Sequence, residues 1–238
     1  MSIDRERIRS LVRSTGWDVV RFRGDFARHQ QHLLEHADIE CVVDVGANEG
    51  QYGMRLRRLG FRGDIVSFEP IPAASAILRR RCENDVRWTA HEVAIGDRSG
   101  TVALHLSGNS VSSSLLDITP RHVGAEGTSA YVGDVSVAIE PLDSYLALLP
   151  ERLWLKVDVQ GAEVAVLRGA ELVLKRTHLI QIEMSLVELY RGAPTLLGLQ
   201  THLDQLGFDL IDVERGFTES ESGALLQLDG LFGRRGTP

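Results

Sequence analysis

The chain has 238 residues, of which 43% are hydrophobic and 25% charged, the composition of an ordinary globular protein. Its formal net charge of −7 argues against a dedicated nucleic-acid binder, which usually carries a basic face, and no apolar run approaches the roughly 20 residues that a membrane-spanning helix needs. The N-terminus, MSIDRERIRS, lacks the apolar stretch of a secretory signal, and two cysteines cannot build a disulfide framework. We therefore expect a cytoplasmic enzyme or small-molecule binding domain; the sequence leaves the oligomeric state open, with a homodimer as one option.

The first 38 residues are strongly charged and predict a helical N-terminal extension, with helices over 4–14 and 25–36. Residues 39–238 have the pattern of one α/β domain, because short apolar runs alternate with helical segments. Such runs are typical of strands buried on both faces of a parallel sheet. In the first half we predict strands over 41–45, 65–69 and 86–95, and helices over 50–59 and 72–84.

The alternation is interrupted at about residues 100–140. Residues 100–106 and 135–139 alternate between apolar and polar side chains like half-exposed strands, and a loop rich in glycine and serine, 107–133, lies between them. We expect a β insertion after the third strand that carries a mobile loop. Because long loops in compact domains are usually functional, we interpret this loop as a lid over the ligand.

The alternation of strands and helices resumes in the second half of the chain. We predict strands over 153–158, 179–183, 208–213 and 224–231, and helices over 162–175 and 194–206. Only a short loop joins the last two strands, so they should pair antiparallel. The sequence therefore predicts an α/β sheet of about seven strands with helices on both faces.

The main chemical signal is the string VVDVGANEGQ at 42–51, where a buried strand runs into a glycine turn and then a helix. Glycines let a ligand approach the backbone closely, and in open α/β sheets ligands bind outside the carboxyl ends of the strands. The spacing is not the G-x-G-x-x-G of dinucleotide folds, and the carboxylate of Asp44 would repel a pyrophosphate. It suits a cationic ligand such as S-adenosylmethionine, with its sulfonium and ammonium groups. The candidate cofactor-binding residues here are Asp44, Gly46, Ala47, Asn48, Gly50 and Gln51.

The ends of the next two strands supply further candidates. Glu69 ends the second predicted strand, where a carboxylate can accept hydrogen bonds from both ribose hydroxyls of a nucleoside. Pro70 fixes the chain as it turns away. Ala94, near the end of the third predicted strand, could border the adenine.

Several strings together resemble the FkbM-type methyltransferases. They cover roughly residues 40–185, and KVDVQGAE is the most specific of them. The strings are VDVGANEG at 43–50, FEP at 68–70, SSSL at 112–115, LDSYL at 142–146, LKVDVQGAE at 155–163, VLRGA at 166–170 and IQIE at 180–183.

This resemblance implies a class I, Rossmann-like fold that binds S-adenosylmethionine and methylates hydroxyls of sugars, polyketides or other secondary metabolites. Because its serine string falls inside the predicted lid, Ser113 joins the candidate cofactor-binding residues. We expect a small-molecule or saccharide acceptor and no nucleic acid.

Methyl transfer to an alcohol needs positioning and a group that takes the hydroxyl proton. Asp158 ends the fourth strand of the domain, where it could contact the methionine ammonium or act as the base, and Glu183 ends the next strand beside it. Both are candidate catalytic residues. Lys156 we interpret as structural, and Glu163 either favours the start of its helix or belongs to the site. The two carboxylates could also hold Mg²⁺, but a divalent site needs several oxygen ligands and only two are placed here, so Mg²⁺ is not favoured and we predict no metal-binding residues.

Alternatives remain open at this point. One is an NAD(P)-dependent reductase, which the missing G-x-G-x-x-G disfavours, and another is a nucleoside-binding module that has lost catalysis. His91, His105 or His122 could each serve as the base, since imidazole titrates near neutrality.

Overall fold

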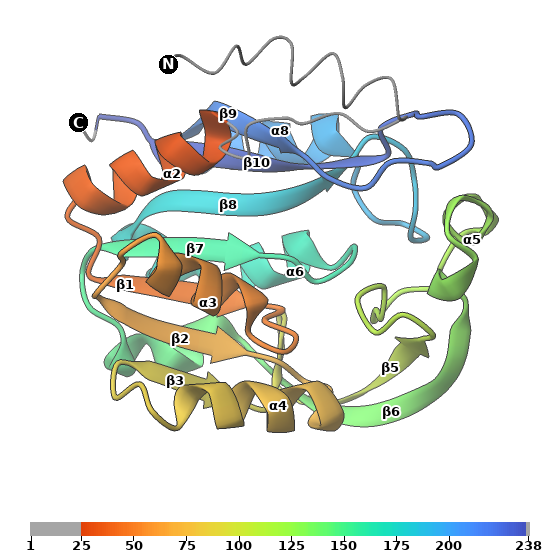
Figure 1. Cartoon of the computed structure of the whole chain (residues 1–238), viewed down its shortest axis with the longest axis horizontal. Coiled ribbons are helices and arrows are strands. Elements are labelled where there is room, and N and C mark those ends of the chain that lie inside the picture. The colour runs from red at the N-terminus through yellow and green to blue at the C-terminus, as the bar shows by residue number, and fades with distance from the viewer. Residues whose placement is uncertain (1–24, 237–238) are drawn as a thin grey trace, which may run out of the picture.

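The computed structural model describes residues 25–236, so the predicted helix over 4–14 lies outside the described residues. Seven strands form one sheet in the order β3-β2-β1-β7-β8-β10-β9 (Figure 1). All neighbours from β3 to β8 pair in parallel, whereas β10 runs antiparallel to both β8 and β9, as predicted for the last pair. The strands are β1 Cys41–Val45, β2 Asp64–Phe68, β3 Trp88–His91, β7 Leu153–Val157, β8 Thr177–Ser185, β9 Phe208–Arg215 and β10 Gln227–Arg234.

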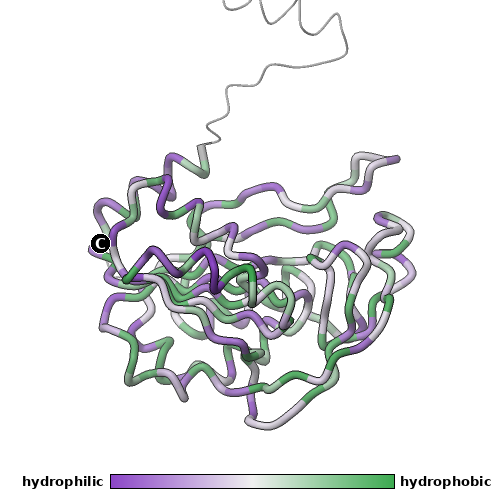
Figure 2. The backbone as a smooth tube through the Cα atoms, turned by 60° about the horizontal axis from the view of Figure 1, so that its bottom comes forward, coloured by the Kyte–Doolittle hydropathy of each residue, from purple (hydrophilic) through white to green (hydrophobic). Residues whose placement is uncertain are grey.

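Helices cover both faces of this sheet because its strands are apolar on both sides. In β1, Val43 and Val45 belong to the core beneath α6, α7 and α8, whereas Val42 points to the core beneath α2, α3 and α4. Figure 2 shows hydrophobic stretches along the strands in the middle of the molecule. The helices are α2 Asp25–His36, α3 Gln51–Arg58, α4 Pro72–Cys82, α6 Glu163–Arg168, α7 Glu171–Arg176 and α8 Leu196–Gln205.

The last predicted strand, 224–231, lies three residues later in the structure as β10, and two other predicted elements are divided. The helix over 162–175 is divided into α6 and α7 at Gly169, where a side-chain Cβ would overlap the carbonyl oxygen of Gly96. The carboxylate of Asp143 then accepts the N–H groups of Leu172 and Val173 at the start of α7. The strand over 86–95 is also divided, because only β3 pairs with β2 and the chain then leaves the main sheet.

The insertion forms a second sheet in the order β4-β6-β5, built from β4 Ala94–Ile95, β5 Gly100–Ser107 and β6 Tyr131–Glu140. The predicted loop over 107–133 contains a helix, α5 Pro120–Ala125, which starts with proline after the capping side chain of Thr119. Two short 3-10 helices, Gly127–Ser129 and Leu142–Leu148, flank β6. In Figure 1 the arrowheads of β1, β2, β7 and β8 point toward the side where β5, β6 and α5 lie.

None of the helices within residues 25–236 is both long and apolar enough to cross a membrane.

Candidate active site

A pocket lies at the carboxyl edge of the main sheet, between the ends of β1 and β7. Strand order reverses there, since β2 and β3 follow on one side of β1 and β7 and β8 on the other, and such switch points are where open α/β sheets bind ligands. The pocket holds about 700 Å³ of empty space, open solvent at its mouth included. Predicted site residues that line it are Gly46, Asn48, Glu69, Pro70, Ala94, Ser113 and Asp158.

The glycine turn after β1 lets two loops approach closely. Gly46 has a φ of 82°, and a Cβ at this position would overlap the carbonyl oxygen of Asp158. The N–H groups of Gly46 and Ala47 both donate to the carbonyl oxygen of Phe68, at 3.0 Å each. Because the turn is tied to β2 and pressed against the end of β7, its backbone forms a fixed floor of the pocket.

Glu69 places a carboxylate in the pocket wall with only 4% of its surface exposed. Its oxygens accept the backbone N–H groups of Asn48, at 2.8 Å, and Ile71, at 2.9 Å. Burial raises the pKa of Glu69 to about 7, although the two hydrogen bonds oppose that shift. Each oxygen keeps a lone pair that can accept a ligand hydroxyl.

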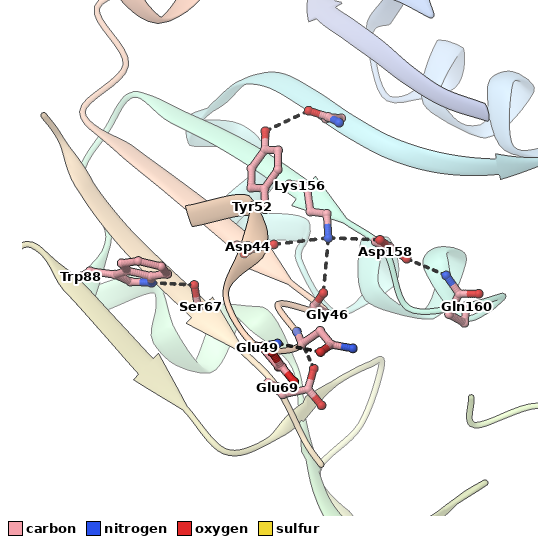
Figure 3. A network of polar contacts seen from close by, with 12 residues as sticks. Asp44, Gly46, Glu49, Tyr52, Ser67, Glu69, Trp88, Lys156, Asp158 and Gln160 are labelled. Atoms are coloured by element: carbon pink, nitrogen blue, oxygen red, sulfur yellow. Dashed lines mark hydrogen bonds and ion pairs between the residues drawn. The ribbon is translucent and has the colours of Figure 1, made fainter. Parts of the chain in front are cut away.

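Lys156 lies inside the site, between two carboxylates (Figure 3). Its ammonium lies 3.4 Å from Oδ1 of Asp44 and 3.3 Å from Oδ2 of Asp158, and it donates to the carbonyl oxygen of Gly46 at 3.3 Å. Asp44 is fully buried, so this cation is its counter-charge. Burial disfavours the charged lysine, but Asp158, Asp44 and Asp229 outweigh it and the pKa of Lys156 is raised.

Gln160 joins the two predicted catalytic carboxylates. Its Nε2 donates to Oδ1 of Asp158 at 2.7 Å and to Oε2 of Glu183 at 2.8 Å. The hydroxyl of Tyr190 donates to Oε1 of the same amide at 2.7 Å. Asp158 and Glu183 therefore belong to one hydrogen-bonded group, in which Asp158 lines the pocket and Glu183 is bound to Gln160, which also lines it.

The insertion closes the remaining side of the pocket with the segment from Ser110 to Leu115. The hydroxyl of Ser114 donates to the backbone carbonyl of Gln160 at 2.6 Å, and its backbone exchanges two hydrogen bonds with that of His105 in β5. The predicted lid is thereby attached both to the small sheet and to the turn that carries Gln160.

Some predicted cofactor residues lie outside the pocket wall. Asp44 is beneath it, paired with Lys156, and Ala47 is buried with its N–H on β2. Gly50, at φ 87°, packs against Trp88, and Gln51 is exposed at the start of α3.

Glu163 is buried at the start of α6, where Oε1 accepts the N–H of Gly161 at 2.9 Å, and burial raises the pKa of its carboxyl to about 7.

The histidines considered as bases do not line the pocket. His105 pairs with Asp134, His91 stacks on Phe68, and His122 packs against the ring of Tyr190. Within residues 25–236, no group of three or more His, Cys, Asp or Glu side chains is arranged to hold a metal ion.

Sequence patterns alone did not indicate Gln160 or Tyr190. The only signal for Gln160 was its place inside the KVDVQGAE string, and Tyr190 comes from a segment that matches no string of the resemblance. Asp158 follows the end of β7 two positions after Lys156, a spacing that puts two side chains on the same face of an extended chain and could have revealed their contact.

Comparison with known proteins decides the family. The profile of the methyltransferase FkbM domain matches residues 44–210. The chain belongs to the FkbM methyltransferase family. It is a methyltransferase, and the reductase and non-catalytic alternatives are therefore set aside.

Relatives and a solved structure agree with this family. The chain is 31% identical over 190 residues to the 2-O-methyltransferase NoeI of Sinorhizobium fredii, covering 75% of this chain and 76% of NoeI. It is 30% identical to Methyltransferase 1 of Beauveria bassiana over 75% of each chain. A rRNA methylase from Streptococcus thermophilus has the same fold, with a TM-score of 0.50 at 12% identity over 90% of this chain and 99% of that one.

Proposed function

We propose that this methyltransferase uses S-adenosylmethionine to methylate a hydroxyl of a saccharide, glycolipid or polyketide-type metabolite. The main evidence for the identity of the cofactor is the charge of the pocket, where Glu69 and Asp158 lie on either side of the Gly46 turn. Two carboxylates suit a nucleoside whose sulfur is cationic and would repel a diphosphate. We assign residues 39–238 to the methyltransferase domain, with an insertion at about 100–140, and residues 1–38 to an N-terminal extension.

The residues of the pocket fit the three parts of this cofactor. Glu69 would accept hydrogen bonds from the ribose hydroxyls with its remaining lone pairs. The apolar wall, which includes Ala94 and Leu104, suits the adenine ring. Gly46 and Asp158 would hold the methionine part, the first by leaving space at its backbone and the second by its carboxylate.

When bound, S-adenosylmethionine supplies an electrophilic methyl group on a positively charged sulfur. The enzyme must hold the acceptor oxygen in line with that group, and in favourable cases positioning alone is worth about 7–11 kcal/mol. The segment from Ser110 to Leu115 would keep water out of the pocket. Asp158 and Glu183 supply the carboxylates that can take up the hydroxyl proton.

An oxygen acceptor is favoured by the relative NoeI, which is named as a 2-O-methyltransferase, and by the hydroxyl of Ser113 and the amide of Gln160 in the pocket wall. A net charge of −7 favours a small acceptor over a nucleic acid.

The decisive experiment incubates the protein with S-adenosylmethionine carrying a ¹³C-labelled methyl group and a panel of methyl hexosides, methyl deoxyhexosides and macrolactone alcohols. We expect a labelled methyl ether, detected by NMR and mass spectrometry, on at least one acceptor. Isothermal calorimetry with S-adenosylhomocysteine should show binding, and NAD(P) should give none. Absence of S-adenosylhomocysteine binding, or transfer only to nitrogen, would contradict the proposal.

A further inference from the structure

We propose that Glu183 is the catalytic base, and that Asp158 stays ionised as the partner of Lys156 and of the cofactor. This inference rests on the proposed O-methylation and divides the work between two carboxylates that the sequence does not distinguish. The evidence for this division is the pattern of hydrogen bonds at the four carboxylate oxygens, two on Asp158 and two on Glu183.

Both oxygens of Asp158 are already held. Oδ2 accepts the ammonium of Lys156 at 3.3 Å, and Oδ1 accepts the amide of Gln160 at 2.7 Å. A proton on either oxygen would remove an acceptor from a donor that points at it, and would weaken the ion pair with Lys156. Asp158 is therefore placed to remain a carboxylate through the reaction.

Glu183 has one oxygen left open. Its Oε2 accepts two amides, from Gln160 at 2.8 Å and from Gln227 at 2.7 Å. Its Oε1 has no hydrogen-bond partner within residues 25–236, and the side chain is half-buried rather than sealed. The two glutamines fix the carboxylate while Oε1 can receive the hydrogen of an acceptor hydroxyl.

The groups that face Glu183 make it the better proton acceptor. Burial, followed by the charges of Asp158 at the end of β7, Glu163 in α6 and Asp229 in β10, raises the pKa of Glu183, and Lys156 opposes this. A base whose pKa lies nearer the working pH holds a transferred proton more strongly. Tyr190 adds no charge, because its pKa is also raised, mainly by burial.

Gln160 is the positioning residue of this arrangement. It lies at a φ of 56°, which is uncommon for a residue other than glycine, and the Ser114 hydroxyl holds its backbone oxygen. Because the hydroxyl of Tyr190 donates to its Oε1, its NH₂ group must face the two carboxylates.

In the proposed step the acceptor oxygen displaces sulfur from the methyl carbon. A bond forms between the acceptor oxygen and the methyl carbon, and the bond between that carbon and sulfur breaks with its electron pair remaining on sulfur. The proton of the hydroxyl moves to Oε1 of Glu183 and leaves for water when the methylated product departs.

The test compares Glu183→Gln with Asp158→Asn. For Glu183→Gln we expect kcat to fall about 10²–10⁴-fold with the acidic limb of its pH profile lost, while the Kd for S-adenosylhomocysteine changes by less than about twofold. For Asp158→Asn we expect this Kd to rise about tenfold or more. Glu171→Gln, on the exposed surface of α7, is the matched control and should leave both constants unchanged.

A second measurement needs neither acceptor nor cofactor. In protein labelled with ¹³C at the glutamate carboxyls, the resonance missing from Glu183→Gln identifies Glu183, and its pKa should lie above the ordinary value of about 4.3. Gln160→Glu removes both amide donors and adds a third carboxylate, so that pKa and the acidic limb of kcat should move to higher pH.

An ordinary or lowered pKa for Glu183, or wild-type kcat in Glu183→Gln, would overturn the inference. So would an Asp158→Asn enzyme that loses kcat but binds cofactor normally. These results differ from a failure of the proposed function, in which the wild-type protein itself methylates no hydroxyl acceptor.

Discussion

The two halves of the pocket are built in different ways. On the side of β1 and β2, the main contacts are made by backbone groups, and residues such as Asn48 and Glu69 are 21 positions apart in the chain. On the side of β7, β8 and β10, side chains hold one another, and Gln227 donates to Glu183 across 44 positions. The first half is a rigid backbone surface, here called the backbone cradle, whereas the second is a network of oppositely charged side chains.

This difference predicts which substitutions and which changes of pH each half of the pocket should tolerate. A backbone cradle should be sensitive to added volume and insensitive to pH, except through Glu69. A charge-balanced network should be sensitive to the loss of a single charge, because burial leaves the remaining charges without solvent. Substitutions in the two halves should therefore have different consequences.

Lys156→Met should have the largest effect, because it leaves Asp44 and Asp158 without their common cation. Breaking a buried ion pair costs about 3–5 kcal/mol, and we expect that loss in urea unfolding at pH 8. Burial, which already raises the pKa of Asp44, would then act without the cation that opposes this shift, so stability should return as the pH falls and be lost as it rises.

Lys175→Met, on the exposed surface of α7, is the control and should change the unfolding free energy by less than about 0.5 kcal/mol. A Lys156→Met protein as stable as the wild type at pH 8 would show that the network does not depend on charge balance.

Gly46→Ala should be next in size. The new methyl group would overlap the carbonyl oxygen of Asp158 at a φ that costs alanine about 1–2 kcal/mol, and forcing the loops apart adds about 1–3 kcal/mol. We expect a lower melting temperature and weak binding of S-adenosylhomocysteine.

Gly60→Ala separates the two causes, because Gly60 has a φ of 97° and no atom within 4 Å of its would-be Cβ. Equal destabilisation by the two substitutions would mean that close approach of the loops contributes nothing.

Glu69→Gln should act on cofactor affinity. A hydrogen bond to a charged group is worth about 1.5–3 kcal/mol, so the Kd for S-adenosylhomocysteine should rise about 10–100-fold by calorimetry. Since the pKa of Glu69 is raised to about 7, wild-type affinity should also weaken as the pH falls through 7, and the variant should lack that dependence.

The free protein should show the opposite trend in stability. A carboxyl whose folded pKa exceeds its unfolded value contributes stability while protonated and loses it as the pH rises toward about 7, a loss that Glu69→Gln should reduce. Glu92→Gln, an exposed control, should leave affinity and its pH dependence as they are. Unchanged Kd in Glu69→Gln would remove Glu69 from the cofactor site.

Ser114→Ala should have the smallest effect. It removes the hydrogen bond that the hydroxyl donates to the carbonyl of Gln160 and the one it accepts from the N–H of Leu116, together worth about 1–2 kcal/mol, or about 2–8 °C in melting temperature for a chain of this size. If the insertion also supports the Gln160 turn, kcat should fall more than cofactor affinity does. Ser99→Ala, with an exposed side chain outside the pocket wall, should change neither.

Much of the main sheet could be predicted from local patterns. The run 41–45 becomes β1 without a shift, because a strand buried on both faces is apolar at consecutive positions. The divided elements could not be predicted, since the break at Gly169 depends on packing against Gly96, about seventy residues away in the chain. The helix α5 was missed because its apolar residues are too few to form a period.

The candidate site divides in the same way. The turn at Gly46 and the carboxylate of Glu69 follow from residue types at the ends of adjacent strands, and both line the pocket. The contacts of Lys156, Gln160 and Glu183 depend on strand register and on Tyr190 and Gln227, which come from later segments. Residue type alone does not say which buried carboxylate has a partner.

The order of strands and helices, the glycine turn and the acid after β2 were written into short stretches of sequence, since each depends on residues that are neighbours along the chain. The position of a lysine charge between two aspartates, and the one oxygen of Glu183 left open, were decided only when distant segments packed together. The physical reason is that electrostatic and hydrogen-bond energies depend on distance in space, which local sequence does not specify.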